Sequence, residues 1–145
     1  MMTGRVHGML LAMALGACAS PPVVPGPSAA AAAPLPTLAG TRWTGKLDRN
    51  DDGHNTPRLE FAPGGELHGY TGCNMLGGRW SESGGEVTFS AIFVTKRMCL
   101  GPGAEIEKRV LAALSNQSRV ARTATSLTVV SPQGARYEFA PAAAA

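Results

Sequence analysis

The chain has 145 residues, of which 16% are charged and 44% apolar, and 13 basic against 10 acidic side chains give a net charge of +3. This length accommodates one ordinary domain and is too short for two. The composition excludes a collagen-like chain, a polytopic membrane protein and a highly charged disordered chain. A charge of +3 over the whole chain gives no basis for nucleic-acid binding.

The first 17 residues have the pattern of a secretory signal peptide. Arg5 is the only charged residue among the first 37, and residues 9–15 form an uninterrupted apolar run. This run is too short to cross a bilayer, which needs about 20 apolar residues. Small residues follow it, as they do before a signal cleavage site. The sequence therefore predicts export and removal of residues 1–17.

The end of this segment, Leu-Gly-Ala-Cys at residues 15–18, resembles the lipobox of bacterial lipoproteins. The resemblance implies cleavage before Cys18, diacylglycerol on its thiol and an acyl chain such as palmitate on the new amino terminus. Two or more such chains anchor a protein stably. The alternative is that Cys18 is an incidental residue near an ordinary cleavage site. We therefore expect a lipid-anchored protein of the bacterial cell envelope. Because Ala19 follows the cysteine, where Asp would resemble an inner-membrane retention signal, we expect the protein on the outer membrane, facing the periplasm.

Residues 18–37 are predicted to be a Pro/Ala-rich tether behind the acylated cysteine. They hold six of the eleven prolines and no charged residue. Proline fixes φ and donates no hydrogen bond, so the segment is neither strand nor packed helix. Extended at about 3.1 Å per residue, its residues 20–37 would hold a domain roughly 55 Å from its anchor. Disordered filler is the alternative, and residues 142–145, all alanine, are expected to be a disordered tail.

Residues 38–141 form the predicted folded domain, with 12 basic and 10 acidic side chains and hence a net charge of +2. Alternation of polar and apolar residues and Gly-rich turns indicate a mostly β structure. The expected strands are 42–47, 58–62, 66–70, 79–82, 86–89, 126–130 and 136–139.

One helix is predicted over about residues 104–115. Ile106, Val110 and Leu114 recur every four residues, as on the buried face of an amphipathic helix. Glu105 and Glu107, followed by basic residues 108 and 109, are expected on the solvent-facing side.

Cys73 and Cys99 are the two cysteines that remain if Cys18 is acylated. The envelope outside the inner membrane is oxidising, so this pair is expected to form a disulfide. A nucleophilic cysteine would need His68 or His54 as base and a second thiol kept reduced. A zinc site would lack paired C-x-x-C or H-x-x-H spacing.

Two segments around these cysteines resemble the signature of the META domain, or HslJ-like, family: Gly-Tyr-Thr-Gly-Cys-Asn at 69–74 and Thr-Lys-Arg-Met-Cys at 95–99. The resemblance covers essentially all of residues 38–140. It implies an α+β fold, in which an antiparallel sheet curls into a barrel-like structure with one packed helix, often on an exported lipoprotein. Family members are linked to stress response, to novobiocin resistance and, in parasites, to motility.

No catalytic residue is established for this family, so the resemblance implies none, and we expect no metal, cofactor or enzymatic activity. The motif residues are Gly72, Asn74, Thr95 and Met98. Gly72 and Asn74 suit a sharp bend, because glycine accepts positive φ and asparagine bonds its own backbone. Asn74 and Thr95 are expected to satisfy buried backbone groups near the disulfide, with ligand contact as the alternative.

Two further features have weaker functional interpretations. Residues 48–53 match the first half of a calcium-binding loop, but Leu59 stands where the bidentate Glu is required, which favours a solvated turn over a weak calcium site. Scattered basic residues could face anionic lipid headgroups or glycan phosphates. Ordinary surface charge is favoured, because the acidic residues of the predicted helix can form ion pairs with its basic residues 108 and 109. These basic residues are Lys96, Arg97, Lys108, Arg109, Arg119 and Arg122.

The sequence therefore favours a lipid-anchored, non-enzymatic binding or assembly module in envelope stress tolerance. Its expected partners are the membrane, through the anchor, and an envelope protein, but not nucleic acid. The alternative is an inhibitor-like module that blocks a secreted or envelope hydrolase with an exposed loop. A hydrolase is disfavoured, because two histidines and no Ser-His-Asp signature follow residue 18.

Overall fold

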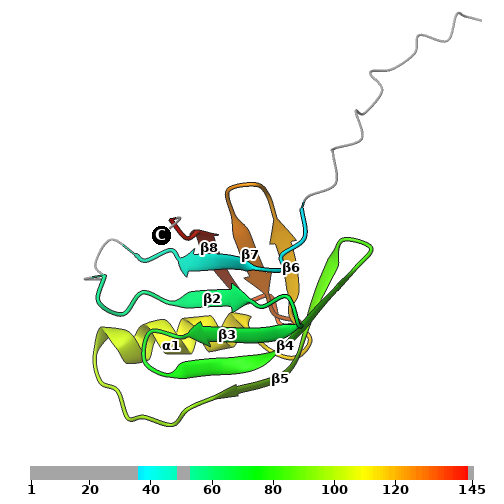
Figure 1. Cartoon of the computed structure of the whole chain (residues 1–145). Coiled ribbons are helices and arrows are strands. Elements are labelled where there is room, and N and C mark those ends of the chain that lie inside the picture. The colour runs from blue at the N-terminus through cyan, green and yellow to red at the C-terminus, as the bar shows by residue number, and fades with distance from the viewer. Residues whose placement is uncertain (1–35, 49–52, 144–145) are drawn as a thin grey trace, which may run out of the picture. The chain divides into compact units, whose positions relative to one another are not determined.

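Antiparallel strands follow one another in chain order around a closed barrel (Figure 1). The computed structural model describes residues 36–48 and 53–143, so the predicted signal peptide, Cys18 and nearly all of the predicted tether lie outside the described residues. Strand β8 pairs back with β1, which closes the barrel. The described strands are β1 (Thr41–Gly45), β2 (Arg58–Phe61), β3 (Glu66–Tyr70), β4 (Met75–Ser83), β5 (Glu86–Val94), β6 (Arg119–Arg122), β7 (Leu127–Val130) and β8 (Arg136–Pro141).

A single described helix, α1 (Pro102–Ala113), connects β5 to β6 and packs against β8. Its buried face includes Ile106 and Val110, as the four-residue repeat predicts. The α+β barrel-like fold is thus confirmed. No helix among the described residues is both long and apolar enough to cross a membrane.

The barrel interior is filled by the apolar side chains of alternate strand positions. Phe61 is fully buried and meets Trp80 edge-to-face, with ring centroids 5.3 Å apart. The indole N–H groups of both tryptophans are satisfied, because Trp43 donates to the hydroxyl of Thr41 and Trp80 to the carbonyl of Ala62. Burial of this apolar area is the main stabilising contribution.

The ladder between β5 and β6 has the fewest paired residues in the barrel, with one registered pair, Thr88↔Arg119. Further along β5 the register with β4 shifts, and Ala91 adopts a positive φ of 50°. Beyond this bulge the amide of Ile92 donates to the side-chain oxygen of Asn116 at 2.9 Å. A side chain thus takes the place of a neighbouring strand at this position.

Two strand predictions need correction, and one strand is missing from the prediction. Strand β4 begins at Met75 rather than at residue 79. The sequence pattern misses this start, because Gly77 and Gly78 interrupt the run of strand-forming residues. Strand β5 continues to Val94 rather than ending at residue 89. The alternation of polar and apolar residues predicts too early an end, because the bulge shifts the two-residue period. Strand β6 was not predicted, because its four residues carry two arginines and no large apolar residue but Val120.

The carboxylate of Glu82 in β4 ties the beginning of the domain to the barrel wall. One oxygen accepts from the Thr37 hydroxyl at 3.0 Å and from the Leu38 amide at 3.2 Å. The other accepts from Arg122 at 2.5 Å. These two charged side chains are only 15% and 9% exposed, so water screens their attraction weakly.

Candidate functional site

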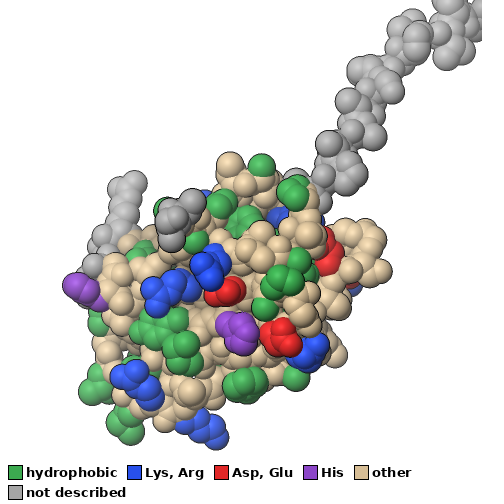
Figure 2. All heavy atoms as spheres, in the orientation of Figure 1, with side chains coloured by type: hydrophobic (Ala, Val, Ile, Leu, Met, Phe, Trp, Pro, Cys, Tyr) green, Lys and Arg blue, Asp and Glu red, His purple; other side chains and the backbone are tan. Residues whose placement is uncertain are grey.

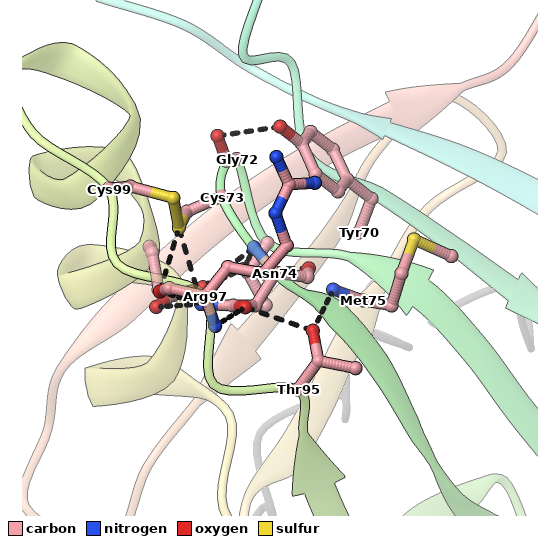
Figure 3. The surroundings of a disulfide bond; sticks show 10 residues. Tyr70, Gly72, Cys73, Asn74, Met75, Thr95, Arg97 and Cys99 are labelled. Atoms are coloured by element: carbon pink, nitrogen blue, oxygen red, sulfur yellow. Dashed lines mark hydrogen bonds between the residues drawn. A yellow bond between two sulfur atoms is a disulfide. The ribbon is translucent and has the colours of Figure 1, made fainter.

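The two motif segments meet at one end of the barrel, where a disulfide joins the β3–β4 turn to the loop after β5 (Figure 3). The Cα atoms of Cys73 and Cys99 are 6.1 Å apart, and the expected disulfide is present. Because each sulfur is bonded to the other, neither residue is the free thiol that a nucleophile or a zinc ligand would require.

Asn74 is the centre of a hydrogen-bond network that holds the loop after β5 in place. Its side-chain oxygen accepts from the Thr95 hydroxyl at 2.9 Å and from the Arg97 amide at 2.7 Å. Its side-chain nitrogen donates to the Arg97 carbonyl at 3.3 Å. The Thr95 hydroxyl in turn accepts from the Met75 amide at 3.1 Å. Both motif side chains therefore bond backbone groups next to the disulfide.

Glu107 does not lie on the solvent-facing side of α1, and this expectation is wrong. Its carboxylate accepts from the Asn74 amide at 3.0 Å and from the Asn74 side-chain nitrogen at 2.9 Å. It also accepts from the hydroxyl of Thr71, a buried residue. Helical periodicity alone misses this role, because it records the position of Glu107 on the helix but not the polar turn packed beside it.

Gly72 lets the turn approach α1 closely. Its φ is +104°, and a Cβ placed on it would lie 2.6 Å from Cγ2 of Ile106. A Cβ on Gly103, at the start of α1, would lie 2.8 Å from the carbonyl oxygen of Gly72. Two glycines thus permit direct contact between turn and helix, and the Tyr70 hydroxyl closes the turn by donating to the Gly72 carbonyl at 2.8 Å.

The segments that meet at this end of the barrel carry four exposed apolar side chains, which we refer to together as the exposed apolar surface: Met75, Phe93, Met98 and Leu100. They are the large hydrophobic side chains that the described residues expose, with exposed fractions of 58%, 65%, 93% and 86%. Phe93 lies against Gly77 of β4, where an added Cβ would be 2.3 Å from its ring. Figure 2 shows hydrophobic and basic side chains side by side at the end of the molecule where the loop after β5 lies.

A shallow groove of about 320 Å³ borders this surface on the outside of β1, β2 and β3. An ion pair lines it, with Nε of Arg42 3.1 Å from the Glu60 carboxylate. The hydrogen bond from Arg42 lowers the pKa of Glu60 below its ordinary value and raises the pKa of Arg42. The Arg58 guanidinium lies 5.6 Å from the centre of the Tyr70 ring, a cation–π distance.

The calcium-like loop at residues 48–53 is only partly within the described residues. Residues 49–52 of the calcium-like loop lie outside the described residues, while Asp48 pairs with Arg109 of α1. Within the described ranges no group of three or more His, Cys, Asp or Glu side chains could hold a metal ion.

Within the described residues, the scattered basic residues fall into two groups, those that form ion pairs and those that do not. Arg109, Arg119 and Arg122 each pair with an acid. In the described part of the chain, neither Lys96 nor Arg97 has a side-chain ion pair, and both lie beside the exposed apolar surface.

Comparison with known proteins agrees with this architecture. A solved NMR structure of a protein from Burkholderia xenovorans has 23% identity and a TM-score of 0.56, and the match covers 84% of this chain and all of that one. A second NMR structure has 21% identity and a TM-score of 0.58, with coverage of 73% and 95%. These likenesses support the fold alone. Curated proteins give no significant match. The META domain family model matches residues 37–144, and the chain belongs to this family.

Proposed function

We propose that the protein is a lipid-anchored component of the bacterial cell envelope, held on the outer membrane by Cys18 and acting as a non-catalytic binding or assembly module in stress tolerance. The observation that carries the proposal is that the motif side chains form structural hydrogen bonds. Asn74 bonds both Thr95 and Glu107, and the three side chains also bond neighbouring backbone groups and thereby brace a surface loop. Such an arrangement suits a rigid recognition surface better than a reaction centre.

The anchor is tested by membrane fractionation of the Cys18→Ser variant. Without the thiol no diacylglycerol can be attached, so the variant should move from the membrane fraction to the soluble one. A His68→Gln variant, which leaves Cys18 in place, should remain with membranes. Unchanged fractionation of the serine variant would refute acylation.

The groove over β1–β3 is the surface that we assign to an envelope protein partner, because it combines the Tyr70 ring with charged side chains. A photo-crosslinking amino acid at His68, which lines the groove, should yield a specific adduct in intact envelopes. The same group at Gln133, in the exposed β7–β8 turn, provides the control. Equal labelling at both positions would argue against a specific partner.

An inhibitor-like module is the second candidate, favoured by the disulfide-braced loop that presents Met98 and Leu100 to solvent. Inhibitor loops of this kind must be both protruding and rigid. This candidate predicts that a hydrolase purifies with the tagged protein and that Met98→Ser together with Leu100→Ser abolishes this capture. Retention of the hydrolase by the double variant would rule out the loop as the inhibitory element.

A further inference from the structure

The loop after β5 combines two properties that ordinary surface loops do not share. Its apolar side chains Met98 and Leu100 are almost fully exposed. Its backbone is fixed by the Cys73–Cys99 disulfide and by the bonds between Asn74 and the backbone of Arg97. Exposed apolar side chains on a rigid support indicate an interaction surface rather than a disordered tip.

The loop itself carries only basic charge, and the exposed acid Glu105 follows it in the first turn of α1. Residues 87–104 contain Lys96 and Arg97 and no acidic side chain. Both basic side chains are exposed and adjoin Met98 in sequence. Glu107, the acid on the neighbouring helix that bonds this region, directs its carboxylate to Asn74 and Thr71. The loop therefore presents two exposed apolar side chains directly after two exposed basic ones.

We propose that the exposed apolar surface, with Lys96 and Arg97, is a second, non-covalent membrane contact that inserts Met98 and Leu100 among the headgroups of an anionic phospholipid bilayer. Interfacial elements bind in this way, with apolar side chains at the headgroup boundary and basic ones beside lipid phosphates. The two exposed basic side chains beside Met98 are what favour an anionic lipid surface as the occupant.

This inference takes the membrane location from the proposed function, and the length of chain upstream permits it. Seventeen residues lie between Cys18 and Pro36, the first described residue. At up to about 3.5 Å per residue they could span roughly 60 Å, whereas a domain of about 100 residues has a radius of gyration near 13 Å. An anchored domain could therefore turn this loop toward the bilayer.

The test uses the full chain with Cys18→Ser, so that no acyl chain contributes, and a tryptophan introduced by Met98→Trp. The two native tryptophans are in the core, with Trp43 6% and Trp80 8% exposed, so the new indole is the one that lipid can reach. A Gln133→Trp variant on the β7–β8 turn is the positional control. Vesicles contain equimolar phosphatidylcholine and phosphatidylglycerol, with brominated acyl chains as quenchers.

We expect a blue shift and bromolipid quenching at position 98 and neither at position 133. Removing the two charges by Lys96→Gln and Arg97→Gln should lower vesicle affinity by about 30-fold, since each basic residue contributes about 1 kcal/mol at an anionic surface. The charge-matched control, Arg119→Gln with Arg136→Gln, should have little effect. Arg119 lies opposite Thr88, six residues and about 20 Å before Val94 along β5.

Absence of quenching at position 98, or equal quenching at 133, would overturn the proposal. A blue shift that appears without lipid as protein concentration rises would assign the surface to a second copy of the chain. A shift caused by solubilised envelope proteins but not by vesicles would assign it to a protein partner. Both would contradict lipid docking. The anchor is judged separately by fractionation of Cys18→Ser, so either proposal can fail alone.

Discussion

At the scale of single residues, Gly72 is the position where a small change should have the largest effect. It combines a positive φ with contact to Ile106. We expect Gly72→Ala to destabilise the domain by about 3 kcal/mol, from backbone strain and overpacking together. Gly40→Ala separates the two effects, because Gly40 has φ +76° and no atom within 4 Å of an added Cβ. It should destabilise by about 1 kcal/mol. Equal changes in urea unfolding would show that packing against α1 contributes nothing.

The contact between Asn74 and Glu107 gives a second prediction at this scale. Asn74→Asp replaces the donor that faces Glu107 with a carboxylate, and we expect a loss of about 2–3 kcal/mol of unfolding free energy. Adding Glu107→Gln should restore most of it, because the glutamine amide can donate where Glu107 accepted. A double-mutant cycle measures this coupling. Additive effects would show that the two side chains do not interact.

At the scale of elements, the disulfide connects the β3–β4 turn to the loop before α1 and encloses a sequence separation of 26 residues. Replacing both cysteines by serine should lower the unfolding free energy by about 3–4 kcal/mol in the chain-entropy model. Reduction of the native protein should have the same effect in chemical denaturation. A much smaller loss would indicate that the unfolded chain retains structure even without the disulfide.

The elements also show how far the sequence predicts this protein. Helix α1 and the strands with regular alternation, such as Arg58–Phe61, follow from local pattern alone. Met75–Leu76 at the start of β4 do not, because Gly77 gives no strand signal and serves instead as the place where Phe93 packs. The disulfide is predictable from compartment chemistry. The groove and the apolar surface arise from residues distant in sequence, so only tertiary structure brings them together.

At the scale of the whole molecule, the β5–β6 ladder is where the barrel should open most readily. Its single registered pair is supplemented by the bond from Ile92 to Asn116. We expect Asn116→Ala to accelerate hydrogen exchange of the Ile92 amide by about tenfold and to leave β3 amides unchanged. Gln117→Ala, at an exposed neighbouring position, should change neither. Uniform acceleration around the barrel would mean that strand separation here is coupled to global unfolding.

The Glu82 carboxylate has a mechanical consequence for a protein held by its amino-terminal end. Tension from residues before Pro36 would first reach Thr37 and Leu38, and their bonds to Glu82 pass it to β4, more than 40 residues away in sequence. The next segment, β1, is bonded on both edges, to β2 and β8. In single-molecule pulling, Glu82→Ala should therefore lower the rupture force, and an unchanged force would place the resistance in β1 alone. A domain tied in this way would resist force applied at its amino-terminal end without the barrel separating from its first strand.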